Sequence, residues 1–203
     1  MTTLLIVLAG MALVVGPIAY LMPSRRDREL ASLRMAARAR GLEVELARLP
    51  KLNADAHERV SASGIAKQPV LECVEYGLPL PLALQGALSW RALVAPETEF
   101  PLTPGLPNLE LDRGATPNVP LPPYFAALPE ILAALPADTV ALGVTRTGVV
   151  CYWHERLGGA ADSAAGHRPA GAQASGEAIL DALAQALRAL LAHHAAWLKE
   201  AEF

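Results

Sequence analysis

TVALGVTRTGVVCYWHE, residues 139–155, carries the strongest structural signal in the chain. Two runs of alternating side chains, 139–145 and 149–155, flank the connection Arg146-Thr147-Gly148. A short connection that contains glycine between two such runs is typical of a β-hairpin. This segment therefore predicts two antiparallel strands.

Three upstream segments have the pattern of further strands. In the first, Val44 and Leu46 alternate with acidic residues, which predicts a strand with one buried face. Segments 70–76 (VLECVEY) and 88–94 (LSWRALV) are rich in strand-forming residues. Together with the hairpin, they predict an antiparallel sheet of about five strands.

Helical patterns flank these strands. The first covers residues 25–40, with Ser24 placed to cap it and Gly41 to end it. A short helix is predicted within 124–135, and a long C-terminal helix over 177–201 has leucines on one broad face. That face packs on the sheet or on a partner.

Two segments predict irregular structure. Residues 100–123 contain seven prolines, which remove backbone donors and favour a surface loop with extended pieces. A polyproline ligand is the alternative interpretation of this segment. Residues 158–176 are rich in Gly, Ala and Ser, which is typical of a flexible linker.

The N-terminal segment Thr3–Met22 has no charged residue. A helix of this length spans about 30 Å, the thickness of the bilayer hydrocarbon, whereas the core of a signal peptide has about 7–15 residues. We therefore expect contact with the lipid bilayer through residues 3–22; a cleaved signal peptide is the rival interpretation. Basic residues follow the span, which predicts a single-pass protein of the bacterial inner membrane with its N-terminus outside and a cytoplasmic domain.

The expected fold class is α+β, with a single N-terminal transmembrane helix, an antiparallel sheet and flanking helices. The expected division is 1–23 transmembrane anchor, 24–41 basic juxtamembrane helix, 42–157 α+β domain, 158–176 flexible linker and 177–203 C-terminal amphipathic helix packing on the domain.

Composition excludes some classes of function. The net charge of −3 argues against a nucleic-acid partner, because such proteins usually carry a basic surface. The two cysteines, Cys73 and Cys151, form neither a disulfide framework nor a metal-binding pattern. We expect both to be small buried side chains.

Candidate catalytic residues are few. His193 and His194 are adjacent on a helix and point about 100° apart, so they do not chelate one metal together. His154 and Glu155 point to opposite faces of a strand, and no nucleophile motif or phosphate-binding loop accompanies them. The sequence thus predicts no catalytic, cofactor-binding or metal-binding residue, and no enzyme.

Six arginines of the 25–40 helix are candidate lipid-headgroup contacts, and two acids leave a local charge of +4. Attraction of basic residues to anionic headgroups competes with a simpler interpretation, a topology signal on a solvated helix. The candidates are Arg25, Arg26, Arg28, Arg34, Arg38 and Arg40.

The tryptophans have two interpretations. Aromatic residues in strands usually fill the core, but an exposed tryptophan often dominates a protein interface. The candidate partner face comprises Trp90, Trp153 and Trp197.

The layout of the N-terminus resembles the family of YajC, an accessory subunit of the bacterial Sec protein-translocation machinery. The resemblance consists of a very short N-terminus, one span, and Pro-Ser-Arg-Arg (23–26) leading into a basic helix. It covers about the first forty residues, and the GD-x-V-x-T-x-GG segment of the family is absent here. The chain also resembles single-span proteins of proteobacteria that carry the same translocase label.

The expected function is that of a membrane-anchored, non-catalytic accessory or scaffold protein, with a membrane or membrane-proximal protein as partner and a link to protein translocation. The alternative is a membrane-tethered enzyme or small-ligand-binding domain with a pocket between the sheet and residues 100–123. A pocket lined by His154, Glu155 or Asp138 would favour that alternative.

Overall fold

The computed structural model describes seven parts of the chain: residues 24–51, 54–94, 109–112, 122–126, 128–136, 138–155 and 176–201. The predicted membrane span, nearly all of the predicted linker and most of the proline-rich segment lie outside these ranges. Within the described ranges, no helix is both long enough and apolar enough to cross a membrane.

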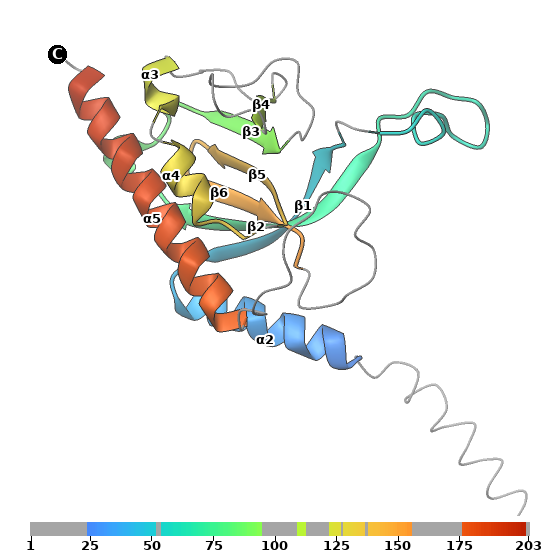
Figure 1. Ribbon diagram of the computed structural model, residues 1–203, viewed down its shortest axis with the longest axis horizontal. Helices are drawn as coiled ribbons and strands as arrows, with labels where there is room; N and C mark the ends of the chain where they lie inside the picture. The colour runs from blue at the N-terminus through green and yellow to red at the C-terminus, as the bar shows by residue number, and fades with distance from the viewer. Residues whose placement is uncertain are drawn as a thin grey trace, which may run out of the picture.

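The fold is α+β, as predicted, and the described strands form one antiparallel sheet of six rather than about five (Figure 1). The order across the sheet is β1-β2-β6-β5-β3-β4. The strands are β1 (Glu43–Pro50), β2 (Val70–Pro79), β3 (Trp90–Val94), β4 (Leu109–Leu111), β5 (Thr139–Val144) and β6 (Gly148–Trp153). The helices are α2 (Arg25–Ala39), the 3-10 turn η1 (Leu82–Leu84), α3 (Pro122–Phe125), α4 (Leu128–Ala133) and α5 (Gly176–Ala201).

The hairpin predicted from residues 139–155 is confirmed as β5 and β6. The Thr145 amide donates to the Gly148 carbonyl at 2.8 Å and closes the turn. Strand β6 pairs with β5 on one side and β2 on the other, so the hairpin lies inside the sheet.

Two elements differ from the prediction. Strand β4 is a three-residue segment within the proline-rich stretch, where no strand was predicted, and it pairs with β3. The single helix predicted within 124–135 is two short helices, α3 and α4. In both places the segment is so short that its local sequence pattern does not indicate which part of the fold it contacts.

Helix α2 begins and ends as predicted. The Ser24 hydroxyl accepts from the Asp27 amide at 3.2 Å, and the Asp27 carboxylate accepts from the Ser24 amide at 3.0 Å, which completes a capping box. After the helix, Gly41 adopts a φ of 81°, which favours glycine.

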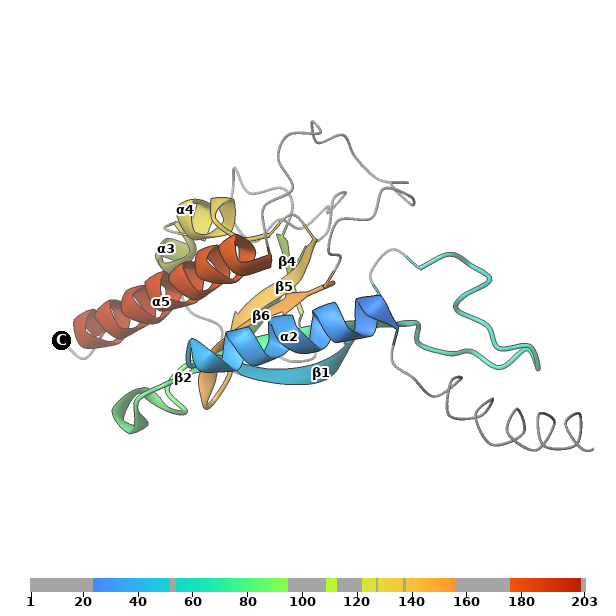
Figure 2. The same cartoon turned by 90° about the horizontal axis from the view of Figure 1, so that it is seen from below.

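One face of the sheet is covered by α2, α4 and α5 (Figures 1 and 2). Helix α5 contributes four leucines at helical spacing, Leu180, Leu183, Leu187 and Leu190, each fully buried. On the other face a smaller cluster contains Cys73 and Tyr152. Cys73 and Cys151 are both free and buried, as predicted.

The first strand corrects one detail of the prediction. Leu46, expected on a buried face, is 80% exposed, whereas Leu49 is buried against the opposite face. Strand β1 is the edge of the sheet and pairs only with β2 among the described strands. An edge strand has neighbours on one side only, so alternation alone did not identify its buried residues.

Candidate functional site

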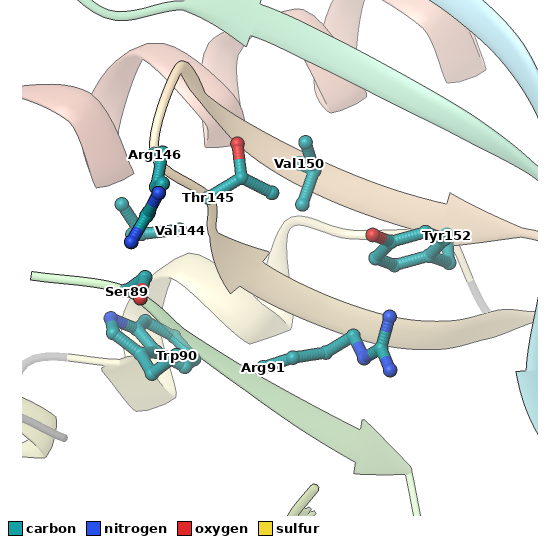
Figure 3. Close-up of a pocket in the computed structure, with 8 residues that line it drawn as sticks. All are labelled: Ser89, Trp90, Arg91, Val144, Thr145, Arg146, Val150 and Tyr152. Atoms are coloured by element: carbon teal, nitrogen blue, oxygen red, sulfur yellow. The ribbon is translucent and has the colours of Figure 1, made fainter. Parts of the chain in front are cut away.

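A pocket of about 230 Å³ lies along β3, β5 and β6, beside the turn of the hairpin (Figure 3). Arg91 and Tyr152 lie toward one end of it, and Ser89 and Arg146 toward the other. The lining residues are Ser89, Trp90, Arg91, Val144, Thr145, Arg146, Val150 and Tyr152.

Close strand packing shapes this site. Gly143 is the register partner of Arg91, and a Cβ atom at position 143 would lie 2.5 Å from the Trp90 carbonyl oxygen. Only glycine therefore fits between β5 and β3 at this point. On its other side Gly143 is the register partner of Val150 on β6.

The turn fixes the mouth of the pocket. The Thr145 hydroxyl donates to the Gly148 carbonyl at 3.0 Å and accepts from the Gly148 amide at 3.0 Å. Arg146, next in the chain, is exposed. The turn thus presents one guanidinium group at the rim.

A second guanidinium group lies deeper. Arg91 donates through Nε to the Asp112 carboxylate at 3.0 Å, and its Nη2 also pairs with Asp112. The guanidinium carbon lies 5.8 Å from the centroid of the Tyr152 ring, in cation–π range. Burial, with the charge of Glu75, raises the pKa of Tyr152 to about 12, so its hydroxyl stays protonated at neutral pH. Because Asp112 balances Arg91, Arg146 supplies the additional positive charge.

The pocket presents hydroxyl and guanidinium groups. Its polar groups come from Ser, Thr, Tyr and Arg, and no histidine, cysteine or carboxylate is among the described residues that line it. In the part of the chain that the structure describes, no group of three or more histidine, cysteine or acidic side chains could hold a metal ion. The site therefore suits a small polar or anionic ligand.

The residues named for the catalytic alternative do not line this pocket. The His154 amide donates to the Asp138 carbonyl at 3.2 Å, which brings those two residues together through the backbone. Glu155 is buried, with its side chain 4% exposed, and belongs instead to a separate polar network.

Glu155 is the centre of a buried polar network. Arg34 donates to both carboxylate oxygens of Glu155, through Nε at 2.9 and 3.1 Å and through Nη2 at 2.5 Å. The Tyr76 hydroxyl donates to the same carboxylate at 2.5 Å, and burial together with Glu155 raises the Tyr76 pKa. The network joins α2, β2 and the end of β6. Local sequence patterns do not reveal this network, because its members are far apart in the chain.

The six candidate arginines divide into two groups. Arg34 and Arg40 point into the domain: Arg40 donates to Asp181 of α5 at 2.7 Å. Arg25, Arg26 and Arg28 are exposed in the first turn of α2, and Arg25 also pairs with Glu29 at 3.2 Å. Arg38 is exposed as well and reaches the Val44 carbonyl at 3.4 Å.

The three tryptophans lie on the helix-covered face. Trp90 and Trp153 are each 1% exposed, so neither indole is available to a partner. Trp90 packs against Phe125 with ring centroids 5.3 Å apart, and Trp153 packs against Tyr76 at 5.9 Å. Trp197 is half-buried, with its ring 5.6 Å from that of Tyr124. The core interpretation therefore fits Trp90 and Trp153.

The adjacent histidines both contact Tyr124. His193 Nε2 donates to the Tyr124 carbonyl at 2.8 Å, since a carbonyl oxygen only accepts. His194 Nδ1 lies 3.2 Å from the Tyr124 hydroxyl, and burial followed by the charge of His193 lowers the pKa of His194. These contacts dock α5 on α3.

The chain matches no protein-family model, no curated protein and no solved structure. The resemblance to the YajC family consequently stays a prediction. The geometry of the described residues is therefore the basis for assigning a function.

Proposed function

We propose that the chain is a single-span protein of the bacterial inner membrane whose cytoplasmic domain serves as a non-catalytic accessory or scaffold unit for a protein partner. The uncharged run 3–22, followed by a helix with basic residues in its first turn, supports an anchored chain with this orientation. The observation that carries the proposal is the attachment of α2.

Helix α2 is built into the domain. Its Leu33 and Ala37 are buried in the main core, and its Arg34 holds the buried Glu155. Arg40 adds an ion pair to α5. Helix α2 therefore joins Ser24 rigidly to the domain, which a flexible linker would not do.

A fixed orientation favours a scaffold role. Confinement to the membrane raises the effective concentration of the domain for membrane partners, so modest affinity suffices. The apolar surface that we assign to the partner lies at the edge of the sheet, where Leu46 of β1 is 80% exposed and Met35 of the adjoining α2 is 65% exposed. An edge strand also offers backbone groups for pairing.

Site-specific photocrosslinking in intact membranes tests this assignment. A photoreactive residue at Leu46 should give one defined adduct with a membrane protein, and the same residue at the exposed Gln185 of α5 should not. A Met35→Asp substitution should abolish the adduct. Recovery of Sec components would extend the proposal to protein translocation, whereas equal labelling from both positions would contradict it.

The anchor requires its own test. The full-length chain should remain with membranes after alkaline carbonate extraction, and a C-terminal tag should be digested only when the cytoplasmic side is accessible to protease. Extraction of the chain into the soluble fraction would contradict the anchored arrangement.

The pocket supports a second candidate, the binding of a small anionic ligand. Ser89 and the exposed Arg146 offer donors at the cavity, whereas the Tyr152 hydroxyl is already hydrogen-bonded to Glu75. A ligand that binds only the folded chain raises its Tm, and above its Kd the rise grows with the logarithm of the ligand concentration.

Inorganic phosphate and simple carboxylates are the first probes for this candidate. The rise in Tm should disappear in Arg146→Gln and persist in Arg48→Gln, which alters an exposed guanidinium on β1. An equal rise in both variants would indicate nonspecific ion binding and would remove the candidate.

A further inference from the structure

Residues 54–69 form an arm that projects from the sheet between β1 and β2 (Figures 1 and 2). Its tip, residues 59–67, is a small hairpin closed by its own hydrogen bonds. The Ser61 amide donates to the Ile65 carbonyl at 2.8 Å, and the Lys67 amide donates to the Arg59 carbonyl at 2.8 Å. Gly64 makes the turn with a φ of 78°. The tip is therefore a defined structure.

The tip exposes apolar side chains. Ile65 is 67% exposed and Val60 is 46% exposed. Arg59 and Lys67 flank them, and residues 59–67 contain no acidic residue. Exposed apolar groups between cations are the combination that partitions into the headgroup region of an anionic membrane.

The position of the arm follows from the lengths of the preceding elements. Helix α2 has 15 residues and carries the chain about 22 Å away from Ser24. After the turn at 40–42 the chain reverses, and the eight residues of β1 run about 26 Å back toward the same end of the long axis. The arm therefore starts at the end of the molecule where α2 begins and the uncharged run has just ended.

Both views agree with the position expected from the lengths of α2 and β1. The arm and the N-terminal end of α2 lie at the same end of the long axis, and the C-terminal end of α5 lies at the other end (Figures 1 and 2). The exposed Arg25, Arg26 and Arg28 belong to the same end as the arm.

We infer that the tip of the arm is a second membrane contact, with Val60 and Ile65 in the headgroup region of an anionic bilayer and Arg59 and Lys67 at the lipid phosphates. This inference rests on the proposed anchor. Two contacts, the span and the arm, fix the tilt of the domain at the membrane. The β1 edge is then held in one orientation toward its partner.

Fluorescence of the full chain in vesicles of phosphatidylglycerol and phosphatidylethanolamine tests the inference. An environment-sensitive dye is attached at Ile65→Cys, and Lys199→Cys near the opposite end of the molecule is the matched control. The native cysteines stay unlabelled, because burial raises the pKa of Cys73 to about 11 and that of Cys151 to about 12.

The expected result is blue-shifted emission at position 65 that lipid-borne spin labels quench, and water-like emission at position 199. Combining Ile65→Cys with Arg59→Gln and Lys67→Gln should return the emission toward that of water, as should vesicles of phosphatidylcholine alone.

The possible results distinguish a failure of the arm contact from a failure of the proposed anchor. A chain that floats with the vesicles but shows water-like emission at position 65 overturns the arm contact and leaves the anchor intact. A blue shift that lipid spin labels do not quench indicates a protein neighbour and also overturns it. A chain that does not float with vesicles overturns both proposals.

Discussion

The two hairpins of the sheet have opposite constructions. The β5–β6 hairpin is closed by a short turn and lies inside the sheet, with every residue of β6 buried. The β1–β2 hairpin lies at the edge and opens into the arm, where Val60 and Ile65 are exposed. Just after β6 the buried Glu155 carboxylate is paired with Arg34 and Tyr76, whereas apolar groups stay uncovered on the arm.

This difference separates stability from recognition within one sheet. Substitutions in and beside the β5–β6 hairpin should reduce the free energy of unfolding. Substitutions in the β1–β2 hairpin and its arm should leave the fold intact. They should instead change the contacts that the domain makes with the membrane and with its partner.

The largest expected effect concerns two carboxylates. Glu155→Ala removes the partner of Arg34 and Tyr76 and should lower the free energy of unfolding by about 3 kcal/mol, the lower end for a broken buried pair because Arg34 still reaches water. Glu58→Ala in the arm breaks an ion pair with Lys51 and should change it little. Urea titration measures the free energy of unfolding of both variants. Equal losses in the two would contradict the proposed difference between the two hairpins.

The sequence predicted the elements better than it predicted their partners. The β5–β6 hairpin and the capped α2 depend on local patterns, so residues 139–155 and Ser24 were sufficient to identify them. The pairing of Arg34 with Glu155 depends on tertiary contact across 121 positions, which no local pattern encodes.

The same limit applies to the pocket and to the tryptophans. Gly143 permits the close approach of β3 beside the pocket, but a glycine in a strand does not reveal which strand approaches it. For Trp90 and Trp153 the sequence favours the core, but only their burial decides between the core and an interface. The Leu46 error has the same origin, since the edge position of β1 is a property of the whole sheet.

Strand glycines provide the second contrast. Gly143→Ala places a methyl group 2.5 Å from the Trp90 carbonyl oxygen and should cost about 2 kcal/mol of stability. Gly77→Ala on β2 meets its nearest atom, Val150 Cγ1, at 3.6 Å and should be nearly neutral. Thermal unfolding compares the two, and a Gly143→Ala chain as stable as Gly77→Ala would show that β3 moves freely.

A third, smaller effect depends on pH. Burial raises the pKa of Glu75 on β2, and the neighbouring Glu45 and Glu43 add to it. A pKa raised in the folded state favours folding of the protonated form, and that stability is lost as the pH rises above the unfolded value of about 4.3. Glu75→Gln should therefore be more stable than the parent chain at pH 7, with the advantage disappearing below about pH 4.

Stability measured between pH 3 and 8 checks this prediction. Glu72→Gln, at an exposed position of the same strand, is the control and should show no such gain. A Glu75→Gln chain that is less stable at pH 7 would mean that the hydrogen bond with Tyr152 outweighs burial.

The smallest expected effect is in the arm. Val60→Ser with Ile65→Ser should change the free energy of unfolding by no more than about 0.5 kcal/mol, because both side chains are exposed. Circular dichroism during urea titration measures it. A larger loss would show that the arm packs on the domain, which would remove the contrast between the two hairpins.

Helix α5 has a consequence for the synthesis of the chain. It supplies Leu180, Leu183, Leu187 and Leu190 to the face of the sheet and follows every described strand in sequence. The ribosome therefore makes all six described strands before α5, the longest of the helices that cover them, exists. During that interval the sheet has an uncovered apolar surface, which is prone to aggregation. Folding of the domain is completed only when residues 176–201 emerge, so translation of residues 156–175 sets how long the nascent sheet must be protected.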